Sequence, residues 1–420
     1  MTELTKSLGP VSGTAMMLNT VLGAGILILP GLAAQQIGAM SIWTWALCAL
    51  ANIPLLAMFA LLASRYPEAG GVGHIAGRAF GSFGNVITSF LFLGAVFVGL
   101  PSIALTGGYY LGDALGIDHW IAAIFLVGVA TGANFTLPGT ASRLGSYIAA
   151  GVIAMLVILL VASWYTVWGN PAVGATDTPI PAPNLSIIAP FMLVFFAFTG
   201  WEVAIGTSEE FRDPRRDIPR AVFASFVIAV GFYIACALVI IAAGPVAFGN
   251  APFLTILAPT VGSTLAIVLA GGAAVMIAAN LFAAVWAVSR MLFSLSREGQ
   301  LPMFLSGSQR GMPLKAVGTT GIIVICVVMF DAVGVVDVDV LFATAGQNFL
   351  LIYGVSAAAF FTLSTGVVDR VIAAIVMIMV VGIIYIAGLN LIYPITLIMA
   401  AGALVIYRQR FPSVSEPSQP

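Results

Sequence analysis

One carboxylate stands apart from the other ionisable side chains of this sequence. Glu202 is the only Asp, Glu, Lys, Arg or His that lies well inside an apolar segment. An ionisable group in such surroundings is costly to keep and is a candidate functional residue by default. It could load and release a proton as its surroundings change. The alternative is a structural acid that caps a helix or lines a polar vestibule, because Glu209 and Glu210 follow two turns later.

Glycines interrupt two apolar stretches, GAGILILP at 23–30 and FFAFTGWE at 195–202. In a helix interior each glycine costs about 1 kcal/mol and a proline about 3 kcal/mol. Backbone that unwinds in apolar surroundings leaves N–H and C=O groups in need of partners, and a bound ligand is a common partner. Close packing of helices through small residues is the alternative. The glycines alone support both interpretations equally.

The composition places nearly the whole chain in a lipid bilayer. Of its 420 residues, 61% are hydrophobic and 7% are charged, whereas soluble domains carry about 25% charged residues. A net charge of -1 excludes the basic footprint of a nucleic-acid-binding protein. Cys48, Cys236 and Cys326 all lie in apolar runs, so we expect buried small side chains without a disulfide framework.

Hydropathy predicts twelve membrane spans, of which the first is an uncleaved span. The last two are joined by a tight turn at 388–390, and the alternative counts them as one long helix. The predicted spans are 11–34, 40–64, 84–111, 119–137, 144–168, 186–208, 219–243, 262–294, 315–335, 339–363, 369–387 and 390–407. Residues 65–81 are expected to be a connector with glycine-permitted turns.

Charge predicts the orientation of these spans. All 15 Lys and Arg residues fall on one side of the membrane when the twelve spans are threaded, and the other side carries only acids. By the positive-inside rule both termini are cytoplasmic, in a bacterial-type inner membrane.

The two interrupted spans are the first and the sixth, which begin on opposite sides of the membrane. This predicts two inverted five-helix repeats, residues 11–168 and 186–363, followed by spans 11 and 12 at 369–407. Residues 1–10 and 408–420 would be the cytoplasmic ends.

The broken spans offer complementary groups to a ligand. The second half of span 1 begins near Ile26, and its free N–H groups suit a carboxylate. The first half of span 6 ends near residues 197–199, where exposed carbonyls suit an ammonium group. Together they suit the zwitterionic head of an amino acid, although a sodium ion could use the same carbonyls. We expect interhelical hydrogen bonds, with additional polar contacts to the ligand as the alternative, for Asn19, Asn280 and Asn348.

Four ordered motifs give the chain a family resemblance. It resembles the amino acid–polyamine–organocation superfamily, whose LeuT-like fold is all-α, with twelve transmembrane helices, a 5+5 inverted repeat and discontinuous helices 1 and 6. The motifs are GAGILILP, FFAFTGWEVAIGTSEEFRDPRRDIPRA, SRMLFSLSREGQLP and GGVGHIAGRAFG. Within the superfamily, SLGPVSGTAMM, LGAGILILPGLAA, YPEAGGVGHIAGRAFG and VGLP resemble the amino acid efflux branch, whose members export methionine and branched-chain amino acids.

This resemblance implies roles for individual residues. It places the substrate carboxylate against backbone, with Thr20 beneath, and the α-amine against carbonyls of residues 197–200. Phe196 matches the aromatic gate over the substrate, and Glu202 matches an acid implicated in proton sensing. Some proton-coupled relatives carry a lysine within span 5, and here that span has only Arg143 at its edge. Together with the helix-break geometry and the local aromatic residues, this predicts the substrate-binding residues Thr20, Gly23, Ala24, Gly25, Ile26, Phe196, Ala197, Thr199, Gly200 and Trp201.

The sequence therefore predicts a secondary transporter of neutral apolar amino acids, an exporter driven by the proton gradient. Its expected partners are an amino acid, protons and the lipid bilayer, and the oligomeric state, a homodimer included, is left open. The alternative is an uptake permease or exchanger for cationic amino acids or polyamines. A channel would want a more polar lining. We expect no enzyme, metal or cofactor, because His74 and His119 lie on opposite faces in the threading.

Overall fold

The computed structural model describes residues 8–23, 25–66, 71–136, 140–169, 180–308, 312–388 and 390–410. The side chains of Asn19 and of residues 136, 140–150, 152, 261, 263 and 408–410 lie outside this description. So do Ala24 and most of the predicted terminal segments, at 1–7 and 411–420. Regular structure in the described ranges is helical, and Leu8 and Phe211 form an isolated parallel β-bridge.

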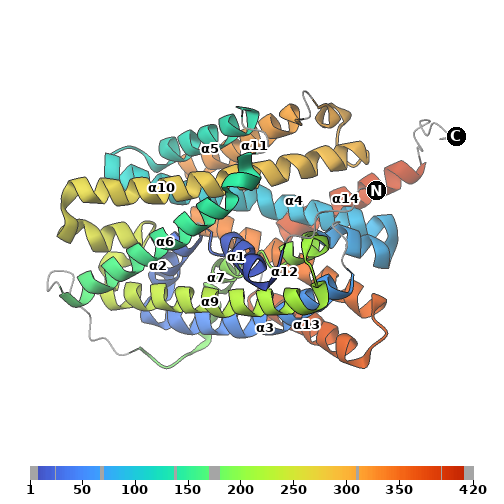
Figure 1. Ribbon diagram of the computed structural model, residues 1–420, viewed down its shortest axis with the longest axis horizontal. Helices are drawn as coiled ribbons and strands as arrows, with labels where there is room; N and C mark the ends of the chain where they lie inside the picture. The colour runs from blue at the N-terminus through green and yellow to red at the C-terminus, as the bar shows by residue number, and fades with distance from the viewer. Residues whose placement is uncertain are drawn as a thin grey trace.

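Most helices run along the long axis of the molecule (Figure 1). In chain order they are α1 (Pro10–Val21), α2 (Gly25–Ile37), α3 (Ser41–Arg65), α4 (Gly71–Leu115), α5 (His119–Thr136), α6 (Thr140–Gly169), α7 (Phe191–Ala197), α8 (Val203–Gly206), α9 (Pro214–Ala243), α10 (Pro252–Arg297), α11 (Leu314–Ala332), α12 (Val338–Leu363), α13 (Val367–Ile386) and α14 (Ile392–Arg410). Short 3₁₀ segments join several of them, at Gly38–Met40, Leu185–Ile188, Ser208–Glu210, Gly244–Ala247 and Met303–Ser306.

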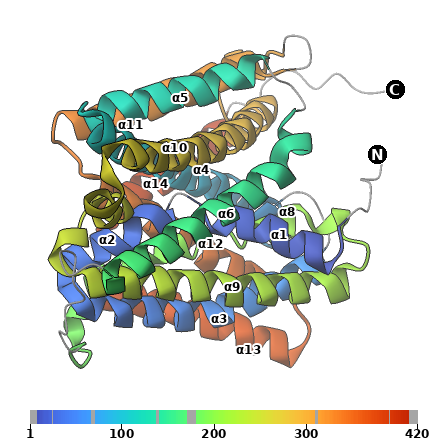
Figure 2. The same ribbon diagram turned by 60° about the vertical axis from the view of Figure 1, so that its left-hand side comes forward.

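The helices pack as two groups, and the chain passes from one group to the other more than once. In the first group α3 lies beside α9, and α1, α2, α7 and α8 pack against these two or against each other. In the second group α4, α5, α10 and α11 pack together, on the opposite side of the molecule from α3 and α9 (Figure 2). Helix α12 contacts both α4 and α7 and so joins the two groups.

Seven helical stretches of the described chain are long and apolar enough to cross a membrane. One of them, Gly25–Arg65, joins α2 to α3. The halves α1, with 12 residues, and α7, with 7, are too short to be among the seven. Each of the twelve predicted spans overlaps a helix or a broken pair of helices in the structure. The number of membrane crossings itself stays a prediction.

The predicted connector at 65–81 differs from the structure. Residues 71–80 form the first part of α4, which continues after a kink at Gly81, whose φ of 70° favours glycine. A matching kink lies at Gly262 in α10, with φ of 72°. The glycines of GGVGHIAGRAFG led us to expect turns. In the structure they lie at the start and at the kink of a helix.

Two contacts tie chain segments together at the ends of helices. The N–H of Leu8 donates to the carbonyl of Glu210 at 2.9 Å, and the N–H of Arg212 donates to the carbonyl of Leu8 at 2.9 Å. The second contact is an ion pair between Arg65, at the end of α3, and the buried Asp369 in the first turn of α13. These contacts join α1 to the segment after α8, and α3 to α13.

Candidate binding site at the two helix breaks

The first helix break separates α1 from α2 where the glycines predict it. Helix α1 ends at Val21, and the Leu22 N–H still reaches the Leu18 carbonyl at 2.7 Å. Helix α2 starts at Gly25, and its Ile26 N–H donates to the Gly23 carbonyl at 3.3 Å. The first-turn N–H groups of α2 therefore begin beside the break, and they carry the partial positive charge of a helix N-terminus.

The second break separates α7 from α8. Helix α7 ends at Ala197, and α8 starts at Val203. Between them Gly200 has a φ of +111°, a conformation that residues with a side chain rarely adopt. In the described part of the chain, the carbonyl oxygens of Phe198 and Thr199 accept no hydrogen bond. These two carbonyls are the free acceptors at this break, within the predicted range of residues 197–200.

The two breaks lie against each other. A Cβ placed on Gly200 would lie 3.2 Å from Cγ2 of Thr20 and 3.5 Å from Cγ2 of Val21. The α-carbon of Gly200 therefore packs closely on the last turn of α1, and its φ of +111° favours glycine there. Thr20 is exposed even though it lies at the middle of this broken span. The sequence placed the breaks at corresponding positions, and the structure brings them into contact.

A tyrosine of α9 bridges the ends of both breaks. The Tyr233 hydroxyl oxygen lies 2.7 Å from the Val21 carbonyl oxygen and 2.6 Å from the Ala197 carbonyl oxygen. A hydroxyl carries one proton, so it donates to one carbonyl at a time. Tyr233 is fully buried, and its ring packs on Trp45 and Phe198 at centroid distances of 5.2 and 5.1 Å. Its hydroxyl therefore lies between the last carbonyls of α1 and α7 and can donate to either one.

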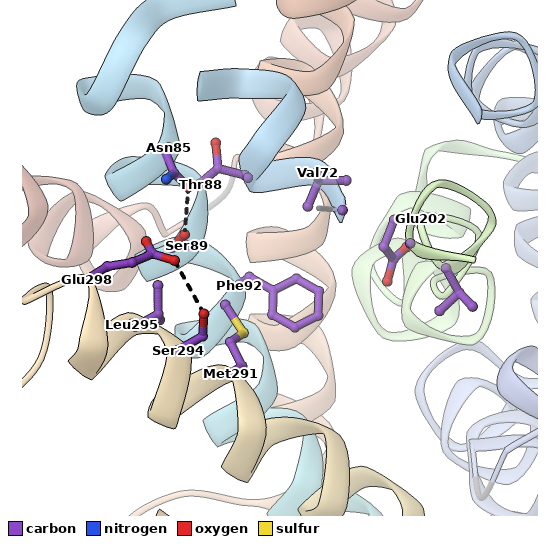
Figure 3. A pocket seen from close by; sticks show the side chains of 14 residues that line it. Val72, Asn85, Thr88, Ser89, Phe92, Glu202, Met291, Ser294, Leu295 and Glu298 are labelled. Carbon is purple, nitrogen blue, oxygen red and sulfur yellow. Dashed lines mark hydrogen bonds between the residues drawn. The ribbon is translucent and has the colours of Figure 1, made fainter. Parts of the chain in front are cut away.

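Glu202 is tied to the second break by hydrogen bonds. Its Oε2 accepts from the Tyr353 hydroxyl of α12 at 2.7 Å and from the Gly200 N–H at 3.1 Å. The residue is 8% exposed, and the Tyr353 ring meets Phe59 edge-on at 4.9 Å. Glu202 also lines one wall of a cavity (Figure 3). Its protonation state thus bears on both the break and α12.

Phe196 lies between the breaks and the second group of helices. Its ring is partly buried and lies 5.0 Å from the Phe342 ring. Positions facing it are small: a Cβ on Gly25 would lie 4.0 Å from Phe196, and one on Gly99 would lie 3.3 Å from it. The Phe196 ring therefore packs against backbone at both glycines.

Of the other predicted site residues, one reaches a helix break and the rest are buried elsewhere. The Asn280 amide nitrogen of α10 lies 3.3 Å from where a Cβ of Gly23 would be, so this side chain reaches the first break. Ile26 is buried in α2. Trp201 packs edge-on against Phe226 in the core. Asn348 is fully buried and its amide nitrogen donates to the Thr344 carbonyl of its own helix at 2.9 Å.

Sequence reasoning missed the two tyrosines, Tyr233 and Tyr353. Both lie in predicted spans, where a tyrosine resembles the other aromatic residues. The one signal available was that a buried phenol hydroxyl needs a polar partner. Among the described residues, no group of three or more His, Cys, Asp or Glu side chains could hold a metal ion.

The chain is similar to several proteins of known sequence. A family model described as amino acid permease matches residues 8–408. The uncharacterized amino acid permease YecA of Bacillus subtilis (strain 168) is 29% identical over 315 residues, which cover 73% of this chain and 74% of that protein. The L-methionine/branched-chain amino acid exporter YjeH of Escherichia coli (strain K12) is 33% identical over 248 residues, 57% of each chain. The putrescine transporter PotE of the same strain is 27% identical over 256 residues, 59% of this chain and 58% of that protein. In these alignments the chain spans less than two thirds of the exporter and of the putrescine transporter.

Proposed function

Because the chain belongs to the amino acid permease family, a family of membrane transporters and not of enzymes, we propose that it is a secondary active exporter of neutral apolar amino acids. The proposed substrates are methionine, leucine, isoleucine and valine, and the proposed driving force is the proton gradient. The chain itself is a multi-pass membrane protein that transports amino acids. The observation that carries the proposal is the contact between the two helix breaks.

The breaks supply a partner for each end of a zwitterion. The substrate carboxylate would accept hydrogen bonds from the first turn of α2, which begins at Gly25. The α-ammonium group would donate to the carbonyl oxygens of Phe198 and Thr199. A sodium ion would use the same carbonyls, so sodium dependence of transport is the control measurement for this assignment. The substrate side chain would lie against Phe196, in apolar surroundings that favour methionine or leucine over arginine.

Proton coupling would act through Glu202. When ionised, its carboxylate accepts hydrogen bonds from Tyr353 and from the Gly200 N–H. Protonation removes the negative charge that strengthens these bonds and so loosens the link between the second break and α12. This gives the proton a direct effect on the geometry of the substrate site.

Alternating access would follow from the two groups of helices. We propose the LeuT-like arrangement of twelve spans with both termini cytoplasmic and two inverted repeats, in a bacterial inner membrane. The paired breaks and the paired kinks, at Gly81 in α4 and Gly262 in α10, support the repeat, because each kink lies between the second and the third predicted span of its half. The group containing α3 and α9 would rock against the group containing α4 and α10.

Export is tested in cells loaded with dipeptides. Cells with this protein should hold less free methionine and leucine than cells without it, and release more into the medium. Dissipating the proton gradient should abolish the difference. Equal intracellular pools in both strains, with the protein present in the membrane, would refute export.

The second candidate function is exchange of cationic amino acids or polyamines. Its support is that Glu202 lines a cavity, together with the similarity to a putrescine transporter. Counterflow in proteoliposomes separates the candidates. Vesicles loaded with unlabelled leucine should take up labelled leucine. Uptake of labelled putrescine or arginine into vesicles loaded with the same compound, with leucine inert, would favour the second candidate.

A further inference from the structure

The two halves of the first broken helix differ in how completely they are buried. Every residue of α2 from Gly25 to Ala34 is buried. Helix α1 instead has exposed residues along its length, from Val11, which is 82% exposed, to Thr20 beside the break. The two halves extend from the break toward opposite ends of the molecule (Figure 2). The break is therefore covered along α2 and exposed along α1.

A tyrosine of the second group of helices holds α2 in this covered position. The Tyr110 hydroxyl of α4 donates to the Leu27 carbonyl of α2 at 2.9 Å. Tyr110 is 1% exposed, so the hydrogen bond is shielded from water. A hydrogen bond in such surroundings is stronger than one in water, and it opposes separation of the two helices. It joins the first group of helices to the second, and these are the groups that would rock against each other during transport.

Close backbone packing continues this contact one turn further along α2. A Cβ on Gly31 would overlap the Gly249 carbonyl oxygen and would lie 3.0 Å from Cγ of Pro252, the first residue of α10. Glycine at position 31 therefore allows α2 to approach the start of α10. Leu27, Gly31 and Ala34 share one face of α2, because residues three and four apart are neighbours on a helix. The covered face of α2 is thus the one that meets α4 and the start of α10.

We propose that the Tyr110–Leu27 hydrogen bond is a latch, which keeps the site at the breaks closed along α2 while the site is open to substrate along α1. Release of the latch lets the covered face of α2 separate from α4 and α10, and this opens the second route to the site. Leu27 lies in the first turn of α2, so the latch also positions the N–H groups proposed to bind the substrate carboxylate. Tyr110 is a positioning residue that acts through α2. The proposal deepens the transport mechanism proposed above and rests on it.

The test follows the reaction of introduced cysteines with a water-soluble maleimide in the purified full-length protein. Ala34→Cys reports on the covered face of α2, and Thr20→Cys reports on the exposed side of the break. Both carry Cys326→Ser, which removes the exposed native cysteine. Adding Tyr110→Phe removes the hydroxyl and keeps the ring. It should speed labelling at position 34 about 3- to 20-fold, the range expected for loss of one interhelical hydrogen bond, and should not speed labelling at position 20.

Two further variants complete the design. Gly31→Ala places a methyl group against the Gly249 carbonyl, so it should speed labelling at position 34 while the Tyr110 hydroxyl is still present. Tyr109→Phe is the control on the same helix, because the Tyr109 ring stacks on His119 of α5 at 4.4 Å, and its labelling should equal that of the parent protein.

Unchanged labelling at position 34 in folded Tyr110→Phe and Gly31→Ala proteins would overturn the latch. Equal acceleration at positions 20 and 34 would overturn it as well, because that result indicates general loosening. Transport by vesicles adds a second readout: in Tyr110→Phe the half-saturation constant for leucine should move in opposite directions at the two faces of the membrane. If wild-type vesicles move no leucine, the proposed function fails, and the labelling still decides whether the latch exists.

Discussion

The substitution Tyr233→Phe tests whether the bridge between the helix breaks matters for transport. It deletes one oxygen atom and leaves the ring that packs on Trp45 and Phe198. The carbonyl oxygens of Val21 and Ala197, now 2.7 and 2.6 Å from the hydroxyl, would lose their shared partner. The ends of α1 and α7 would then lose the one hydroxyl that both of them contact.

The size of the effect follows from the number of bonds lost. The hydroxyl has one proton, so the substitution removes one donated hydrogen bond. Interhelical hydrogen bonds in membrane proteins average about 0.6 kcal/mol and reach about 1.7 kcal/mol, and an unsatisfied buried acceptor costs about 1–3 kcal/mol. A loss of about 1–2 kcal/mol in the aligned geometry corresponds to about a 5- to 30-fold fall in catalytic efficiency of transport.

The assay compares this variant with Tyr393→Phe in proteoliposomes. The Tyr393 hydroxyl also donates to a backbone carbonyl, that of Gly94 at 3.0 Å, but it joins α14 to α4 away from the breaks. Thermal unfolding should show similar small losses of stability in both variants. Only Tyr233→Phe should lose transport, and the reasoning is refuted if both variants transport leucine as well as the wild type.

Other substitutions probe the remaining contacts. Glu202→Gln should keep the protein folded and give transport that no longer varies with external pH, resembling the wild type at acidic pH; wild-type pH dependence in the variant would remove the proton role. Gly200→Ala forces a side chain into a φ of +111° at a cost of about 1–3 kcal/mol and should lower transport about 5- to 150-fold, whereas Gly231→Ala, with open space around it, should have no effect. Arg65→Ala leaves the buried Asp369 carboxylate without this cation and should lower the unfolding temperature, and adding Asp369→Asn should restore part of the loss.

The helix breaks could be predicted because their cause is local. Glycine and proline weaken a helix at their own positions, so GAGILILP and the Thr199–Gly200 pair marked the interruptions without any knowledge of neighbours. The sequence could single out Glu202 as a candidate functional residue for the same reason, since the cost of a carboxylate in an apolar segment depends only on its own charge. The contact of Gly200 with Thr20 follows once the two halves of the chain are paired.

The parts that escaped prediction depend on partners far along the chain. Tyr233 meets Val21 across a sequence separation of 212 residues, and Tyr353 meets Glu202 across 151. No periodicity connects such pairs, because each hydroxyl is aimed by the packing of its whole helix. The helical segment before Gly81 was missed for a different reason: glycine is equally compatible with a turn and with the kinked start of a helix.

The β-bridge between Leu8 and Phe211 constrains how the molecule can change shape. It joins the residues just before α1 to the residues that follow α8. The Phe211 ring also fills the space beside Gly13 that a larger residue at position 13 would need. The bridge thereby connects α1 and α8, which are one half of each broken helix. If the molecule changes shape at the breaks as proposed, movement of one half would be transmitted to the other, and loss of this bridge would uncouple the two.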